Sequence, residues 1–215
     1  MEREKKYKHI IWDWNGTLFD DAWLCVEIMQ NMLKKRDMPG ITLKKYQELF
    51  NFPVIDYYRR LGFDFNVESF QQLGTEYIDA YEERKTECNL QKYTIDVLDS
   101  VFSSGIKQSV LSAYKNDTLQ ELINHFDLKH YFTKVMGLDN HYAESKIDNG
   151  KALIRDLNLA GSSVLFVGDT VHDYEVASSI SVDCILIPSG HQLKEKLERC
   201  GVKVVDSVRD VLNII

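Results

Sequence analysis

Residues 8–18 read Lys-His-Ile-Ile-Trp-Asp-Trp-Asn-Gly-Thr-Leu. An apolar run ends here at the carboxylate of Asp13, and the Gly16-Thr17 pair breaks the run. This pattern predicts a buried strand over 9–13 that delivers Asp13 to the edge of a sheet, followed by a tight loop. Asp is also common at turns, where it bonds to the local backbone. The rest of the chain has to decide between these two interpretations.

The composition is that of an ordinary globular protein. The chain has 215 residues, of which 44% are hydrophobic and 27% charged, enough for one large or two small domains. The formal net charge is −7 and the pI about 5.4. An acidic protein is a poor nucleic-acid binder, because neutralising phosphates needs basic surface, so no nucleic-acid partner is expected. A phosphorylated small molecule bound at a local positive site is still compatible with this charge.

Cysteine usage and hydropathy indicate a reducing compartment. Cys25, Cys88, Cys184 and Cys200 are scattered without a Cys-x-x-Cys pair, so neither a disulfide framework nor a zinc site is expected. The N-terminal residues show no signal-peptide pattern, and no apolar run approaches transmembrane length. We therefore expect a cytoplasmic protein with no membrane partner, present as a monomer or a small homo-oligomer.

The segment 20–85 has helical rather than strand periodicity. Apolar residues recur at helical spacing over 23–33, Thr42 is placed to cap a helix that ends near residue 50, and further helices are expected over 54–61 and 67–85. The aromatic stripe of this segment is more typical of a core than of a cofactor site. The segment is therefore expected to be an all-helical insertion.

From about residue 90, short apolar strands alternate with helices to the end of the chain. This rhythm predicts an α/β fold, a doubly wound (Rossmann-like) and mostly parallel sheet. We expect a core domain of residues 1–19 and 86–215, with a helical cap of residues 20–85 inserted after the first strand. The expected strands are 106–111, 132–136, 163–167, 182–187 and 202–205, and the expected helices include 115–126, 149–157, 173–180 and 191–199.

A second acidic strand end follows the strand 163–167. Asp169 comes directly after Gly168, and Asp173 lies four residues further on, near the start of the next helix. Ligands of such sheets bind at the carboxyl ends of the strands, so both carboxylates can converge with Asp13. Two or three such oxygens describe a Mg²⁺ site. The alternative is that Asp173 caps a helix and Asp169 a turn, although clustered acids are costly unless a cation binds.

Two further residues are candidates for an anion site. Ser112 ends the strand 106–111, where its hydroxyl and the backbone N–H of neighbours such as Ala113 can bind an anion; an ordinary N-cap is the alternative. Lys146 is expected in a loop just ahead of the helix 149–157, where it could neutralise a phosphate and a nucleophilic carboxylate together. Most lysines are simply solvent-exposed, and Lys151, within the helix, is the second choice.

These motifs occur in one order along the chain, and together they resemble the haloacid dehalogenase (HAD) superfamily. The helical insertion resembles the cap of its phosphoglycolate-phosphatase-like branch. The resemblance implies a Mg²⁺-dependent phosphatase of a small phosphorylated metabolite, with Asp13 as the nucleophile that forms an aspartyl-phosphate. It also implies Mg²⁺ ligands at Asp13, the backbone carbonyl of Asn15, Asp169 and Asp173, and a phosphate site of Gly16, Thr17, Ser112, Ala113 and Lys146.

Asn15 departs from the family pattern. Phosphatases of this family usually carry Asp there, which protonates the leaving group and later activates water. An amide does neither, and general acid–base catalysis typically contributes about 10²–10⁴-fold. Substrates with a good leaving group, such as acyl or aryl phosphates, are one explanation. A proton supplied by His141, His172, Tyr114 or a cap residue is another.

Two other functions also stay open. A weakly active or non-catalytic protein that binds a phosphorylated ligand needs no proton transfer at all. A phosphotransferase or mutase would pass the phosphoryl group to a second hydroxyl instead of water.

Overall fold

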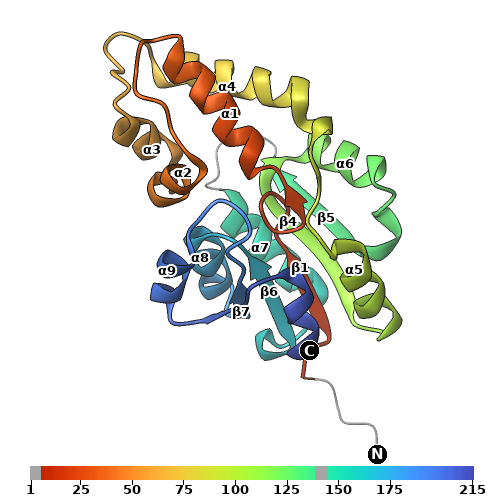
Figure 1. Ribbon diagram of the computed structural model, residues 1–215. Coiled ribbons are helices and arrows are strands. Elements are labelled where there is room, and N and C mark those ends of the chain that lie inside the picture. Colours follow the sequence, from red (N-terminus) through yellow and green to blue (C-terminus); the bar gives the residue numbers. More distant parts are fainter. Residues whose placement is uncertain (1–5, 139–144) are drawn as a thin grey trace, which may run out of the picture.

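The computed structural model describes residues 6–138 and 145–215. Its centre is a six-stranded sheet in the order β5-β4-β1-β6-β7-β8, and every pair of neighbouring strands is parallel. With helices between these strands, the sheet confirms the expected α/β fold class (Figure 1). The strands are β1 (His9–Trp12), β4 (Lys107–Lys115), β5 (Lys134–Leu138), β6 (Val164–Gly168), β7 (Asp183–Leu186) and β8 (Lys203–Val204).

Helices cover both faces of the sheet, because its central strands are apolar on both sides. Ile10 and Trp12 of β1 pack into one buried cluster, and Ile11 between them packs into another. The first cluster is completed by α5 (Thr94–Ser103) and α6 (Asn116–His125), the second by α7 (Ser145–Leu157) and α8 (Val171–Ser179). Shorter helical segments are α9 (Lys194–Leu197) and 3₁₀ turns at Lys85–Glu87, Lys129–Tyr131, Gly161–Ser163, Glu198–Cys200 and Val208–Asn213.

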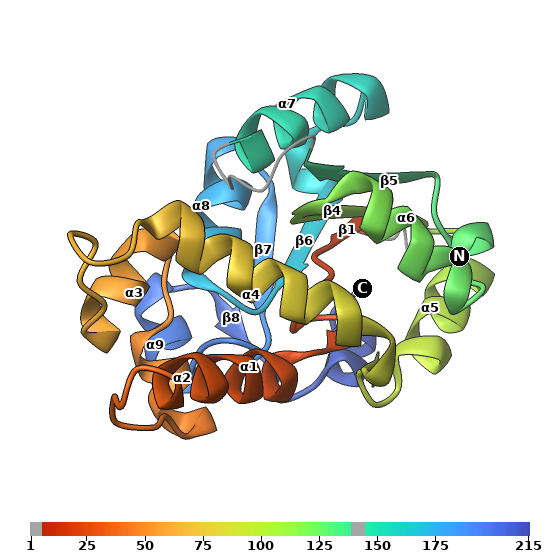
Figure 2. The same ribbon diagram turned by 90° about the horizontal axis from the view of Figure 1, so that it is seen from above.

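Between β1 and α5, the chain forms the expected helical insertion. It stands over the end of the sheet where β1 finishes (Figures 1 and 2). The side chain of Thr42 caps the second helix, as expected, by accepting a hydrogen bond from the backbone N–H of Lys45 at 3.2 Å. The four cap helices are α1 (Ala22–Lys34), α2 (Leu43–Leu49), α3 (Val54–Leu61) and α4 (Phe70–Arg84).

The two linkers between cap and core run side by side. Strand β2 (Phe19–Asp20) enters the cap, β3 (Asn89–Leu90) leaves it, and the two pair antiparallel. The chain therefore enters and leaves the cap at one place, just after the loop that follows Asp13. The expected cap limits, residues 20 and 85, lie close to the paired strands β2 and β3, and they stay predictions.

One helix of the cap starts later than expected. The helix predicted over 67–85 begins at Phe70, because Ser69 and Gln72 form a capping box: the Ser69 hydroxyl accepts from the Gln72 backbone N–H at 3.2 Å, and the Gln72 side chain accepts from the Ser69 N–H at 2.9 Å. This reciprocal pair satisfies two N–H groups that a helix start otherwise leaves unbonded.

Two core elements also differ in length from the expectation. The strand predicted over 106–111 continues to Lys115, so Ser112 lies inside β4 and not at its end. The helix predicted over 191–199 is reduced to the short α9 and a 3₁₀ turn, which leaves His191 in the loop after β7. Both differences change which backbone groups border the site.

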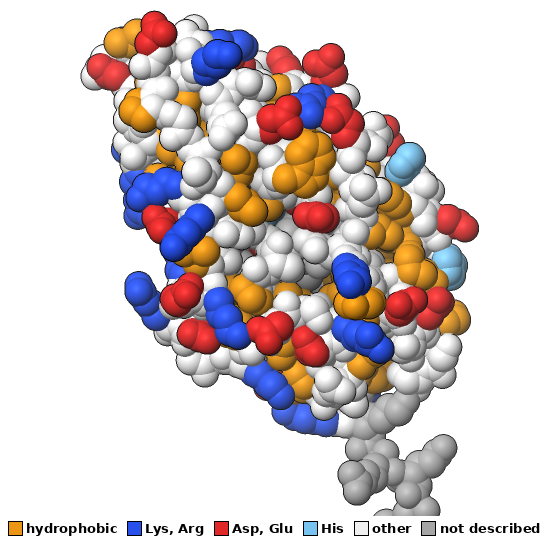
Figure 3. Space-filling view, viewed as in Figure 1, with side chains coloured by type: hydrophobic (Ala, Val, Ile, Leu, Met, Phe, Trp, Pro, Cys, Tyr) orange, Lys and Arg blue, Asp and Glu red, His pale blue; other side chains and the backbone are white. Residues whose placement is uncertain are grey.

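Figure 3 shows acidic and basic side chains interspersed on one face of the molecule. Within residues 6–138 and 145–215, no helix combines the length and apolarity needed to cross a membrane.

Candidate active site

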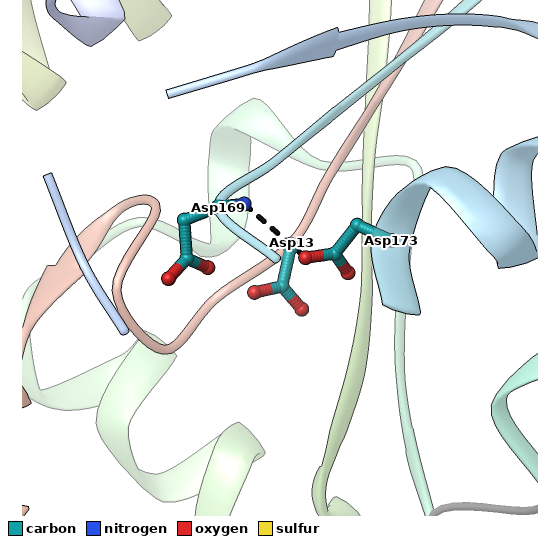
Figure 4. A group of neighbouring side chains, drawn as sticks. All are labelled: Asp13, Asp169 and Asp173. Atoms are coloured by element: carbon teal, nitrogen blue, oxygen red, sulfur yellow. Dashed lines mark hydrogen bonds between the residues drawn. The ribbon is translucent and has the colours of Figure 1, made fainter. Parts of the chain in front are cut away.

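Three carboxylates meet at the edge of the sheet where β1 and β6 end. Asp13 follows β1, Asp169 follows β6, and Asp173 lies in the first turn of α8. All three residues are buried, and one carboxylate oxygen from each lies within 4.8 Å of the other two. Figure 4 shows the three side chains close together. The cluster expected from the sequence is therefore present.

Asp173 serves the helix and the cluster at the same time. Its Oδ2 accepts hydrogen bonds from the backbone N–H of Thr170 at 2.9 Å, the Thr170 hydroxyl at 2.6 Å and the Asp169 N–H at 3.2 Å. With Thr170 as N-cap, this is a capping box. Asp173 therefore does cap the helix, as the alternative interpretation expected. The cap uses only its Oδ2, so its Oδ1 stays available to the carboxylate cluster.

Asp169 is held by hydrogen bonds to both of its oxygens. The Thr17 hydroxyl donates to Oδ1 at 3.1 Å, and the backbone N–H of His191 donates to Oδ2 at 2.6 Å. Two glycines let the backbone come this close: a Cβ at Gly16 would lie 2.3 Å from Oδ2, and a Cβ at Gly190 would lie 2.2 Å from it. Gly16 also has a φ of +75°, which disfavours any other residue.

Lys146 joins the cluster from the other side. Its Nζ donates to Oδ1 of Asp13 at 2.6 Å and to Oδ1 of Asp173 at 2.6 Å, and the side chain is buried. It lies in the first turn of α7, not in a loop ahead of the helix, because α7 starts at residue 145. Lys151, the second choice, is exposed and pairs with Asp148, at 3.6 Å.

The cluster carries more negative charge than one ammonium group balances. Burial, aided by the neighbouring carboxylates, raises the pKa of Asp13 well above its usual value and that of Asp169 to about 6. Burial acts the same way on Asp173, but Lys146 and Thr170 hold its pKa below the usual value. A divalent cation would compensate the surplus charge. Converging carboxylate oxygens are the ligands that Mg²⁺ prefers, so these residues fit that ion.

Three of the residues expected to bind phosphate, Gly16, Thr17 and Ser112, already have hydrogen-bond partners. The Ser112 hydroxyl is buried in β4 and accepts from the Tyr114 N–H at 3.1 Å. Helix α6 begins only at residue 116, because β4 continues past Ala113 with an irregular register, so the helix N-terminus does not border Ser112. The Gly16 N–H donates to Asp21, and the Thr17 hydroxyl donates to Asp169.

Asn15 points its amide nitrogen toward the cap. Nδ2 donates to Oδ2 of Asp21 at 2.8 Å and to the hydroxyl of Tyr81, on α4, at 2.9 Å. The Tyr81 hydroxyl in turn donates to the same Asp21 oxygen at 2.7 Å. The amide nitrogen of Asn15 is therefore engaged by Asp21 and Tyr81.

Asp21 and His191 border the site and were not expected from the sequence. Oδ1 of Asp21 accepts from the Gly16 N–H at 2.9 Å and lies 3.4 Å from Nε2 of His191, whose Nδ1 is hydrogen-bonded to the Tyr46 hydroxyl at 2.8 Å. Although burial acts against it, Asp21 raises the pKa of His191 to about 9. In turn, His191 and the hydrogen bonds hold the pKa of Asp21 below its usual value despite burial.

The sequence offered a weak signal for one of these two residues. Asp21 follows Asp20 just before a helix, where an acid is usually an ordinary cap. The stretch Gly190-His191, by contrast, follows the strand 182–187, whose carboxyl end lies at the same edge of the sheet as those after Asp13 and Asp169. Treating this strand end like the others would have singled out His191.

Two of the residues considered as substitutes for the missing acid, His172 and Tyr114, lie within the described part of the chain. Nε2 of His172 is buried without a partner among the described residues, and its ring packs on Phe52 of the cap with centroids 4.7 Å apart. Burial and Lys146 lower the pKa of His172. The Tyr114 hydroxyl donates to Glu82 at 2.5 Å. His141 lies outside the described residues.

Comparisons with known proteins agree with this architecture. Residues 10–187 match the family model described as haloacid dehalogenase-like hydrolase. The tyrosine-protein kinase PtkA of Mycobacterium tuberculosis is 21% identical over 213 residues, which are 95% of this chain and 72% of that protein.

Solved structures show the same fold. That of protein tyrosine kinase A from M. tuberculosis has a TM-score of 0.82 at 18% identity, covering 98% of this chain and 99% of that one. A predicted phosphoglycolate phosphatase from Haemophilus somnus has a TM-score of 0.79 at 17% identity, covering 98% of both chains.

Proposed function

Because the chain belongs to the haloacid dehalogenase-like hydrolases, we propose that it is a Mg²⁺-dependent phosphatase of a small phosphorylated metabolite. The observation that carries the proposal is the buried cluster of Asp13, Asp169 and Asp173, with Lys146 bound to two of its carboxylates. This set combines a nucleophile, oxygen ligands for a divalent cation and a positive charge for a phosphoryl group.

Asp13 is the nucleophile in this proposal. One carboxylate oxygen attacks phosphorus, the bond from phosphorus to the leaving oxygen breaks, and an aspartyl-phosphate forms. Water then attacks the same phosphorus, which releases inorganic phosphate and regenerates Asp13. Lys146 favours the ionised form of Asp13, against the effect of burial, and balances charge on the phosphoryl oxygens, to which Ser112 donates. Mg²⁺, held by Asp13, Asp169 and Asp173, supplies further positive charge when it is bound.

The leaving group of the proposed substrate follows from the absence of an acidic proton on Asn15. A carboxamide does not protonate the leaving oxygen, so that oxygen has to depart as a stable anion. Acyl and aryl phosphates release such anions, whereas simple alkyl phosphates do not. The proposed enzyme therefore favours phosphates with a low-pKa leaving group.

Turnover of p-nitrophenyl phosphate in the presence of Mg²⁺ tests this function. We expect activity that is abolished by Asp13→Asn and by EDTA, and that returns when Mg²⁺ is added in excess. The matched control is Asp148→Asn, which removes an exposed carboxylate on α7 and should leave turnover unchanged. Activity that survives Asp13→Ala or EDTA would falsify the mechanism.

A second candidate is phosphotransfer to a hydroxyl group. Without a base to activate water, the aspartyl-phosphate at Asp13 is hydrolysed slowly, and an acidic hydroxyl such as a phenol, which gives up its proton to solvent more readily than water does, can attack it instead. The relative named as a tyrosine-protein kinase adds tyrosine side chains to the acceptors worth offering. Phosphorylated acceptor in place of inorganic phosphate would support transfer. A phosphorylated ligand that raises the melting temperature but is not turned over would instead support a non-catalytic binding protein.

A further inference from the structure

We infer that Asp21 is a positioning residue that holds the loop after Asp13 and two separate cap helices in one arrangement. The inference deepens the proposed function and rests on it, because the arrangement matters as that of a phosphatase site. Asp21 stands directly after β2, where the chain enters the cap, and precedes the first residue of α1. Its side chain is fully buried at this junction.

On the loop side, Asp21 binds the second and third residues after the nucleophile, Asn15 and Gly16. Oδ1 accepts from the Gly16 N–H at 2.9 Å, and Oδ2 accepts from Nδ2 of Asn15 at 2.8 Å. The positive φ of Gly16 turns the chain between Asp13 and β2, and the hydrogen bond from its N–H to Asp21 lies at this turn. The carboxylate thereby fixes the plane of the Asn15 carboxamide and the direction of the loop.

On the cap side, the same carboxylate reaches two helices. The Tyr81 hydroxyl, on α4, donates to Oδ2 at 2.7 Å. His191 lies 3.4 Å from Oδ1 and connects through its other ring nitrogen to the hydroxyl of Tyr46, on α2. Asp21 is therefore in contact with α4 directly and with α2 through one imidazole ring.

Burial makes these contacts interdependent. A buried carboxylate is stable only while its hydrogen-bond partners and counter-charge are in place, and each lost partner leaves it less compensated. Displacing α4 removes the Tyr81 hydroxyl that donates to Asp21. Displacing α2 removes the Tyr46 hydroxyl that holds the His191 ring beside Asp21. The order of the Asn15–Gly16 loop and the seating of the cap thus depend on one side chain.

Asp21→Asn tests this dependence, because it keeps the side-chain volume and removes the charge and one acceptor oxygen. The matched control is Asp20→Asn: Asp20 is the preceding residue, half-buried, and its side chain accepts no hydrogen bond from the described residues. Hydrogen–deuterium exchange reports the order of segments 14–20 and 77–84 without any substrate. Kinetics with p-nitrophenyl phosphate and Mg²⁺ report the effect on turnover.

We expect Asp21→Asn to speed exchange in both segments and to lower kcat about 10-fold or more, with KM changed less than about 3-fold. Asp20→Asn should leave both measurements at the wild-type level. Tyr81→Phe removes only the hydroxyl and should shift them in the same direction by a smaller factor. Asp21→Asn with Tyr81→Phe should be no worse than Asp21→Asn alone, because the two side chains act in one network.

Three results would overturn the inference: unchanged exchange in Asp21→Asn, equal effects of Asp21→Asn and Asp20→Asn, or additive losses in the double variant. If Asp21→Asn does not fold, Tyr81→Phe and His191→Gln are compared with wild type instead. Faster exchange in both segments would support the inference, and exchange at the wild-type rate would contradict it. A wild-type protein without turnover, or turnover that survives Asp13→Asn, contradicts the proposed function instead. The exchange measurement still decides the role of Asp21 in that case.

Discussion

Nζ of Lys146 lies 2.6 Å from Oδ1 of Asp13, with both side chains buried. The same ammonium group binds Asp173, so one positive charge holds two carboxylates that belong to different elements of the core. An ion pair in this environment contributes little net stability as a whole, but removing one partner leaves the other uncompensated. The consequences of that asymmetry can be measured.

Lys146→Met keeps the length of the side chain and removes its charge. Without Mg²⁺ we expect the free energy of unfolding to fall by about 3–5 kcal/mol, because two buried carboxylates lose their counter-charge. Added Mg²⁺ should restore part of the loss, since a divalent cation supplies charge at the same place. Urea unfolding with and without Mg²⁺ measures both effects. Lys151→Met, on the exposed side of the same helix, should stay within about 0.5 kcal/mol of wild type.

Asp169→Asn should weaken Mg²⁺ binding while leaving the fold in place. The hydrogen bonds from Thr17 and the His191 N–H reach the carboxylate of Asp169, and an amide oxygen still accepts one of them. At a Mg²⁺ concentration of about 100 times its Kd, wild type should gain about 2.7 kcal/mol of stability. The variant should gain much less at the same concentration. A thermal melt with and without Mg²⁺ checks this, and an equal gain in both proteins would place the ion elsewhere.

Asn15→Asp alone should be a poor variant, although it restores the residue typical of the family. Nδ2 of Asn15 lies 2.8 Å from Oδ2 of Asp21, so the new carboxylate would face a second one at hydrogen-bond distance. Two carboxylates this close do not both ionise at neutral pH. We expect a lower melting temperature and no gain in turnover from the single change.

Exchanging the two residues should succeed where the single change fails. The pair Asn15→Asp with Asp21→Asn keeps an amide–carboxylate hydrogen bond and places the acid at position 15. We expect kcat/KM to rise more on alkyl than on aryl phosphates, by about 10-fold in their ratio, because only poor leaving groups need the proton. A ratio that equals that of wild type would show that the missing acid does not set substrate preference.

His9 should make stability fall in mild acid. Burial lowers its pKa to about 4, against an ordinary value of 6.5, and its Nε2 is hydrogen-bonded to the Ser109 hydroxyl at 2.9 Å. The unfolded chain therefore takes up the proton first as pH falls. The stability from neutral His9 is complete above about pH 6.5 and is lost as pH drops toward 4, on the order of 3 kcal/mol. Urea unfolding of wild type and His9→Gln between pH 7 and 4 should show a shallower slope in the variant, with exposed His130→Gln as control.

Local pattern was enough to predict the sheet and most of the cluster. Strand ends can be recognised from apolar runs, and the carboxyl ends of parallel strands share one edge, so Asp13 and Asp169 had to come close. Asp173 followed because four residues at the start of a helix bring it back over the same edge. None of these inferences needed knowledge of side-chain contacts between distant segments.

The parts that could not be predicted depend on such contacts. Asp21 matters because Tyr81, 60 residues further on, reaches its carboxylate. His191 matters because its N–H meets Asp169, 22 residues earlier in the chain. Neither partner shares a periodic pattern with the other, so the sequence alone shows an acid before a helix and a histidine after a strand.

The paired linkers β2 and β3 have a consequence for the history of such a chain. Phe19 lies opposite Leu90 and Asp20 opposite Asn89, so the chain leaves the core and returns to it across a gap of about 5 Å. A segment attached in this way can lengthen, shrink or be replaced by unrelated sequence without moving any strand of the sheet. Selection can therefore change which molecules are admitted to the site while the residues that perform the chemistry are inherited unchanged.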